Sequence, residues 1–175
     1  YFSGLRMVLA ALALLPVVCL SDRHTQKNGG SGLVWKRMTA AQKKELFMGG
    51  ACCGVMLALG SAFQQLGITL GTGAGKAGFI TAMYMLLVPI LNLLLFKKKS
   101  SWLVWLAVFF GVGGMYLLCV KEDFSLTRGD MLVCICALMF SGHILCCDYF
   151  VKRANPIELA AIQFTTAAVV SAGIA

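Results

Sequence analysis

Six long apolar stretches, separated by short loops rich in Lys and Arg, constrain this chain more than any other feature. Two of them, residues 46–75 and 77–96, carry no charged side chain over 30 and 20 positions. A helix needs about 20 apolar residues to cross the hydrocarbon core of a bilayer. A helix that is apolar on every side is buried in lipid or inside a bundle. The sequence therefore predicts an all-α, polytopic transmembrane helical bundle with the lipid bilayer around it.

The composition excludes a soluble globular domain, because 59% of residues are hydrophobic and only 13% are charged. The pattern predicts six helices, at residues 2–20, 46–71, 76–96, 101–120, 129–150 and 156–175. The first stretch resembles the core of a signal peptide, but no small-residue cleavage site follows it and five similar stretches do. We expect it to span the membrane. Because both ends look cut, we expect further helices before and after this chain.

The net charge of +8 is distributed unevenly over the loops. Successive loops alternate between the two sides of a membrane, which gives 11 Lys and Arg on one side and 3 on the other. The positive-inside rule places the richer side in the cytoplasm. This distribution predicts a multi-pass protein of the cell membrane and argues against nucleic acid as a partner.

The eight cysteines all fall within apolar stretches. No CxxC motif occurs, and no Cys and His spacing is typical of a zinc site. We interpret them as reduced packing residues, with no metal and no cofactor. Gly73–Gly78 matches GxGxxG, but no strand precedes it, so it predicts a tight turn between helices and not a nucleotide site.

Two patterns favour close helix packing and internal symmetry. The second predicted helix contains the GxxxG pairs Gly50/Gly54 and Gly67/Gly71, which allow backbones to approach closely. Leu5–Leu12 resembles Ile162–Val169, and the first and sixth helices run in opposite directions across the membrane. Such an echo is typical of the inverted repeats of secondary transporters.

Polar side chains inside membrane helices are costly and commonly face a cavity or a partner. The predicted substrate pathway consists of Gln64, Gln65, Thr81, Tyr84, His143 and Gln163. Adjacent helical positions lie about 100° apart, so only one of Gln64 and Gln65 is expected to face a cavity.

Three further residues have roles that the sequence leaves open. Pro89 removes a backbone hydrogen bond and is a predicted hinge. Histidine is the residue type best suited to exchange protons, so His143, together with Glu158, is a candidate for proton coupling. A hydrogen-bonded histidine between helices, and a solvated or paired glutamate, are the structural alternatives. Lys76 either attracts anionic solutes or is a solvated loop lysine.

Phe63–Thr69 and Gly75–Leu91 carry a resemblance to a known family. Together with Gly129-Asp130 at the start of a helix, they resemble the EamA family of the drug/metabolite transporter superfamily. The resemblance implies ten helices in two inverted repeats of five. Residues 1–121 would then be the first repeat without its first helix, and residues 129–175 the start of the second.

The sequence as a whole predicts a secondary transporter, not an enzyme, that moves a small organic metabolite or drug across the plasma membrane by alternating access. A non-transporting membrane scaffold or receptor is the first alternative. An intramembrane enzyme that uses His143 is the second. Since His143 and Asp148 are five residues apart, they project from different faces of a helix and do not converge.

Overall fold

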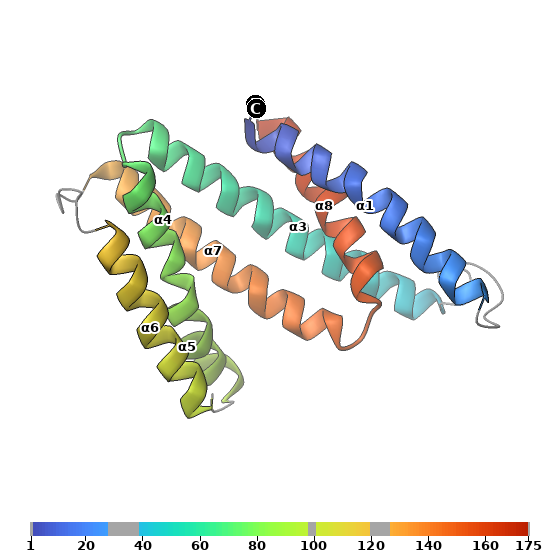
Figure 1. The fold of residues 1–175 in the computed structure, drawn as a ribbon. Coiled ribbons are helices and arrows are strands. Elements are labelled where there is room, and N and C mark those ends of the chain that lie inside the picture. Colours follow the sequence, from blue (N-terminus) through green and yellow to red (C-terminus); the bar gives the residue numbers. More distant parts are fainter. Residues whose placement is uncertain (1, 28–38, 98–100, 120–126, 175) are drawn as a thin grey trace. The chain divides into compact units, whose positions relative to one another are not determined.

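The computed structural model describes residues 2–27, 39–97, 101–119 and 127–174, and its regular secondary structure in these ranges is entirely helical (Figure 1). The all-α fold class predicted from the apolar stretches is therefore confirmed. The helices are α1 (Phe2–Lys27), α3 (Ala40–Thr69), α4 (Ala74–Ala82), α5 (Tyr84–Phe96), α6 (Trp102–Cys119), α7 (Arg128–Val151) and α8 (Pro156–Ile174).

Four helical segments are long and apolar enough to cross a bilayer. They are Ala40–Thr69, Ala74–Leu95, Arg128–Val151 and Pro156–Ile174. In α1 and α6, the apolar segments among the described residues are shorter, at Leu5–Leu14 and Trp102–Gly114. In the part of the chain that the structure describes, four of the six predicted spans therefore have the length and composition to cross a membrane.

The start of α3 lies earlier than the apolar pattern predicts. Thr39 and Gln42 form a reciprocal capping box, in which Gln42 Oε1 accepts from the Thr39 N–H at 2.9 Å. Thr39 Oγ1 accepts from the Gln42 N–H at 3.4 Å. These two contacts satisfy backbone donors that a helix start otherwise leaves unpaired, so α3 begins at Ala40.

The predicted helix at 76–96 is divided into α4 and α5 at Met83. The Met83 N–H bonds the Ile80 carbonyl at 3.2 Å, a tightened turn, and the Met83 carbonyl accepts from both Leu86 and Leu87. Pro89 lies inside α5 and cannot donate to the Met85 carbonyl. The interruption at Met83 therefore lies before Pro89, the predicted hinge.

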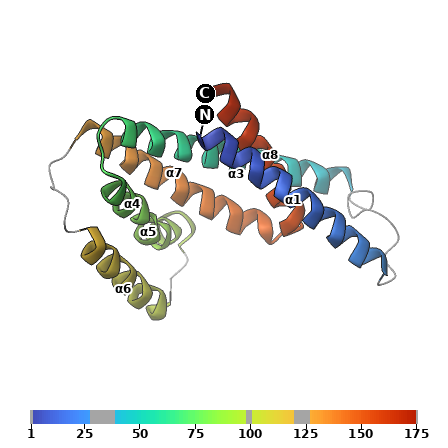
Figure 2. The ribbon, with the colours of Figure 1, turned by 45° about the horizontal axis from the view of Figure 1, so that its top comes forward.

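The chain forms two compact units, which are described separately. The first unit comprises Tyr1–Ala58 and Cys146–Ala175. In it, α1 packs against α8, and the start of α1 lies beside the end of α8, so the two helices run antiparallel (Figures 1 and 2). Their opposite directions agree with the sequence echo.

Close contacts in the first unit depend on small residues. Met7, Ala58 and Ala167 form its buried core. A Cβ atom added to Gly54 would lie 2.5 Å from the Gln163 carbonyl oxygen, so α3 lies against α8 backbone to backbone. The predicted role of the Gly50/Gly54 pair is thus confirmed, since a Cβ on Gly50 would also meet a side chain of α8, at 2.5 Å.

The second unit comprises Leu59–Leu145. Within it, α6 packs against α4 and α5 (Figure 1). The end of α3 meets the start of α7 at two glycines, because a Cβ on Gly129 would lie 2.4 Å from the Gly67 carbonyl oxygen. This close approach brings the turn after α3 next to Asp130 of α7.

Candidate functional site

A hydrogen bond between α3 and α4 joins two of the residues predicted for the substrate pathway. Gln64 Nε2 donates to Thr81 Oγ1 at 2.9 Å. Thr81 is buried and Gln64 is half-buried, whereas the neighbouring Gln65 is exposed. Only one of the two adjacent glutamines is thus turned toward the interior of the second unit, as the helical spacing requires.

Two small residues complete this group, and the sequence reasoning missed both. Cys136 of α7 interacts with the Thr81 side chain and the Gln64 backbone. Ser61 lies one turn before Gln64 on α3, is 2% exposed, and its hydroxyl has no hydrogen-bond partner among the described residues. We call Ser61, Gln64, Thr81 and Cys136 the polar cluster. From the sequence, a serine or cysteine in an apolar helix cannot be told from a packing residue. Ser61 and Cys136 are recognised only because the structure buries them beside Gln64 and Thr81.

The other predicted pathway residues occupy separate positions. Tyr84 lies at the start of α5, with its ring in edge contact with Phe140 at a centroid distance of 6.4 Å. His143 is half-buried on α7, in the second unit. Gln163 and Glu158 are half-buried on α8, in the first unit. Within the second unit, the described structure brings Gln64 and Thr81 into direct contact.

A buried ion pair joins the start of α4 to the start of α7 in the second unit. Lys76 Nζ lies 2.6 Å from Asp130 Oδ2, and their side chains are only 15% and 3% exposed. The Thr72 hydroxyl donates to Asp130 Oδ1 at 2.9 Å, and the Thr127 N–H donates to Oδ2 at 2.7 Å. Lys76 is therefore neither a solvated loop lysine nor a free anion attractor.

The geometry of this ion pair explains the glycine beside it. A Cβ on Gly129 would lie 2.5 Å from Thr72 Oγ1, so glycine leaves room for the turn after α3 to reach Asp130. Burial removes water from the Asp130 carboxylate, which costs free energy. The cationic partner and the hydrogen bonds to both carboxylate oxygens offset this cost. The arrangement fixes the turn between α3 and α4 against α7. In the sequence, Gly129-Asp130 at the start of a helix was the signal for this site. The partner of Asp130 is Lys76, which lies 54 residues earlier.

An open apolar groove of about 460 Å³ lies between α4, α5 and α6 of the second unit. Its lining is formed by Phe79, Leu86, Trp105, Val108, Phe109, Val112, Gly113 and Tyr116. This volume falls in the range of small-molecule sites, which are mostly lined by apolar and aromatic side chains.

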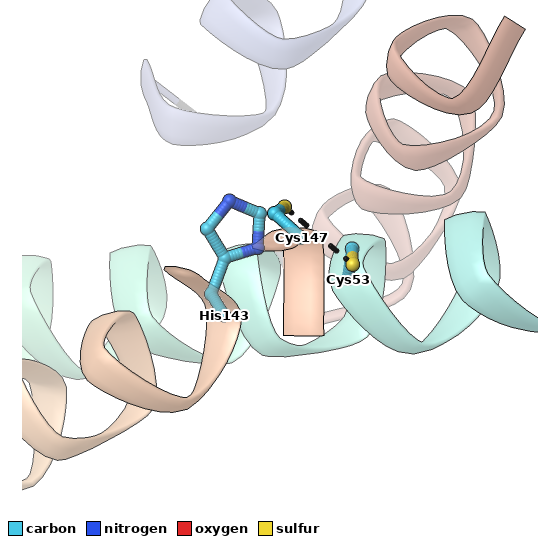
Figure 3. Close-up of side chains that lie close together, drawn as sticks. All are labelled: Cys53, His143 and Cys147. Carbon is cyan, nitrogen blue, oxygen red and sulfur yellow. Dashed lines mark hydrogen bonds between the residues drawn. The ribbon is translucent and has the colours of Figure 1, made fainter. Parts of the chain in front are cut away.

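In the first unit, α3 and α7 bring two thiols together. Cys147 Sγ lies 3.6 Å from Cys53 Sγ and 3.5 Å from Gln163 Oε1. Figure 3 shows the two thiols joined by a dashed line, with His143 one turn before Cys147 on α7. None of the six cysteines whose side chains the structure describes forms a disulfide bond.

Comparison with known proteins gives one informative similarity. The chain is 33% identical over 129 residues to an uncharacterized transporter of Archaeoglobus fulgidus. The match covers 74% of this chain but 41% of the relative, so the chain spans about two fifths of the length of the relative that it matches. No family model matches the chain, and no solved structure matches it.

Together, the four membrane-length helices and the transporter relative indicate an integral membrane protein that is similar to a transporter. The relative is named as a transporter and not as an enzyme. The resemblance to the EamA family stays a prediction.

Proposed function

We propose that this chain is part of a secondary transporter that moves a small organic solute across the plasma membrane by alternating access. The observation that carries the proposal is the polar cluster, with its hydrogen bond between Gln64 and Thr81. Hydrogen-bonding groups placed within apolar membrane helices commonly mark a substrate pathway. The transporter name of the relative supports the same conclusion.

The cluster has the properties of a solute-binding subsite. Gln64 keeps a carbonyl oxygen when its amide donates to Thr81, and the Ser61 hydroxyl has no other partner among the described residues. A solute that offers both a donor and an acceptor would satisfy these groups. We extend the pathway to Tyr84, His143 and Gln163, with Pro89 as hinge and with His143 or Glu158 exchanging protons, and we leave out Gln65 because it is exposed.

The architecture we propose follows the resemblance to the EamA family of the drug/metabolite transporter superfamily. Residues 1–121 would belong to the first of two inverted repeats and residues 129–175 to the second, in a protein of ten helices. The antiparallel packing of α1 and α8 supports an inverted relationship between these two helices. In such transporters, the solute site lies near the bilayer midplane between the repeats.

Reconstitution of the full-length protein in liposomes tests the transport proposal. Uptake of a panel of amino acids, other metabolites and xenobiotics is measured with and without a pH gradient. We expect accumulation of at least one class of solute above that of protein-free liposomes. Absence of uptake for every class, by protein shown to be folded and inserted, would contradict the proposal.

Two adjacent glutamines give a matched pair of variants for the pathway. Gln64→Ala removes the carbonyl oxygen that we propose accepts from the solute and should reduce uptake about tenfold, the effect of losing one hydrogen bond of about 1.4 kcal/mol. Gln65→Ala changes the same chemistry at an exposed position and should leave uptake within about twofold of the parent protein. Equal uptake by both variants would remove Gln64 from the pathway.

The proton role of His143 has its own test. Under an imposed pH gradient, His143→Ala should lose gradient-driven accumulation but keep downhill exchange of the same solute. Gradient-driven accumulation that persists in His143→Ala would show that this imidazole carries no coupled proton.

A further inference from the structure

Four cysteines of the first unit occur as two adjacent pairs on two helices. Cys52 and Cys53 lie on α3, and Cys146 and Cys147 lie on the last turns of α7. Cys53 and Cys147 have a sulfur–sulfur distance of 3.6 Å (Figure 3). Cys146 interacts with both Cys52 and Cys53.

The geometry of the central pair fits ligation by a metal ion. Two sulfurs that each lie about 2.3 Å from one ion are separated by about 3.8 Å at a tetrahedral angle, and by about 4.6 Å when opposite each other. The observed 3.6 Å therefore requires only small side-chain rotations. Gln163 Oε1, at 3.5 Å from Cys147 Sγ, adds an oxygen beside the pair.

The helical spacing of α7 favours a nitrogen ligand as well. His143 precedes Cys147 by four residues, and side chains with this spacing share one helix face. The same spacing allows two side chains of a single helix to ligate one ion in helical metal motifs.

The burial of the pair determines which ions are suitable. Cys53 is fully buried, so an uncompensated charge there would be costly. Thiolates prefer soft d10 ions such as Cu⁺ and Zn²⁺ to hard ions such as Mg²⁺. A monovalent ion that displaces one thiol proton, or a divalent ion that displaces two, leaves the net charge of the site unchanged.

We propose that Cys53 and Cys147 form a binding site for a thiophilic d10 metal ion, which exchanges for thiol protons without a change in net charge. Neither cysteine belongs to the polar cluster, but Gln163 beside Cys147 and His143 on α7 belong to the extended pathway proposed above. Binding forms metal–sulfur bonds and releases the displaced protons to solvent, with no change in oxidation state.

The experiment uses the full-length protein in nanodiscs under argon, with Ag⁺ as the probe for monovalent ions and Cd²⁺ for divalent ions. Binding is followed by the ultraviolet thiolate-to-metal charge-transfer band, and proton release is measured in weak buffer. We expect one proton for each Ag⁺ or two for each Cd²⁺. The arm that gives saturable binding identifies the class of ion, and failure of both arms overturns the proposal.

Variants locate the site. Cys53→Ser and Cys147→Ser should each weaken binding at least about tenfold, because each removes a ligand. Cys134→Ser, at an exposed position on the same helix α7, is the matched control and should bind as the parent protein does. Parent-like binding by both Cys53→Ser and Cys147→Ser overturns the assignment.

A second measurement needs no variant, in case a substitution prevents folding. The parent protein is alkylated with N-ethylmaleimide with and without the ion, and modification of each cysteine is quantified by mass spectrometry. The ion should slow alkylation of half-buried Cys147 and leave exposed Cys134 unaffected. Equal protection of both residues would indicate general thiol binding and would overturn the site.

Discussion

At the scale of single residues, the strongest constraint is a charge that the membrane environment does not tolerate alone. Asp130 is 2% exposed, and its carboxylate is held by Lys76, Thr72 and Thr127. Removal of one partner from such a group leaves an uncompensated buried charge, which is far more costly than loss of a surface ion pair. The pair Lys152–Asp148, at 2.7 Å but about 60% exposed, provides the contrast within the same helix.

This contrast gives a stability prediction. Asp130→Ala should lower the free energy of unfolding by about 3 kcal/mol, because it leaves the Lys76 ammonium buried without its counter-ion. Asp148→Ala should change it by at most about 0.5 kcal/mol, because Asp148 and Lys152 form an exposed i, i+4 pair. Thermal unfolding in detergent measures both. Equal midpoints for the two variants would contradict the ion pair.

At the scale of helices, α3 is positioned by glycines that allow its neighbours to approach. Gly54 faces the backbone of α8 in the first unit, and Gly67 faces the backbone of α7 in the second. Membrane helices lack a hydrophobic driving force for association, so close packing at small residues contributes directly to their affinity. Gly113 of α6 is different, because a Cβ atom there would have no described neighbour within 4 Å.

Substitution by alanine separates these two kinds of glycine. Gly54→Ala places a methyl group 2.5 Å from the Gln163 carbonyl oxygen and should destabilise the protein by about 1–3 kcal/mol. Gly113→Ala should be neutral or stabilising by up to about 1 kcal/mol, because it only reduces the freedom of the unfolded chain. Unfolding midpoints of the two variants test the difference. A Gly54→Ala protein as stable as Gly113→Ala would show that α3 and α8 are not in backbone contact.

Pro89 of α5 gives a second prediction at the scale of helices, about bending during transport. Pro89→Ala supplies the N–H that the Met85 carbonyl lacks, and so continues the hydrogen-bond ladder of α5. If bending at this position accompanies transport, the variant should be at least as stable as the parent but several-fold slower in liposome uptake. An unchanged uptake rate would remove Pro89 as a hinge.

At the scale of the whole molecule, we expect the loop charges to determine orientation. If all six predicted spans cross the membrane, the loops carry 11 Lys and Arg on one side and 3 on the other. The loop around Asn28 lies outside the described residues, so its side of the membrane follows from the sequence alone. The turn at Gly73, by contrast, is described and exposed.

Labelling of intact cells tests this orientation. In a background in which the native cysteines are replaced, Gly73→Cys should react with a membrane-impermeant maleimide, and Asn28→Cys should react only after permeabilisation. Gly73 has φ −57°, so a side chain fits its backbone without strain. Labelling of Asn28→Cys from outside would reverse the proposed topology.

The sequence by itself determined the helices, because about 20 apolar residues in succession leave the backbone no other way to satisfy its hydrogen bonds in lipid. It also selected Gln64 and Thr81, since polar side chains stand out in an apolar helix. It missed the capping box that begins α3 and the interruption of the third predicted helix at Met83. The hinge role of Pro89 stays a prediction.

Only the tertiary structure decided which side chains meet. Lys76 and Asp130 are separated by 54 residues, and Cys53 and Cys147 by 94. Periodicity places a residue on a face of its own helix, but it does not specify the opposing face of another helix. That pairing depends on which backbones approach, and here on glycines whose missing side chains set the distance.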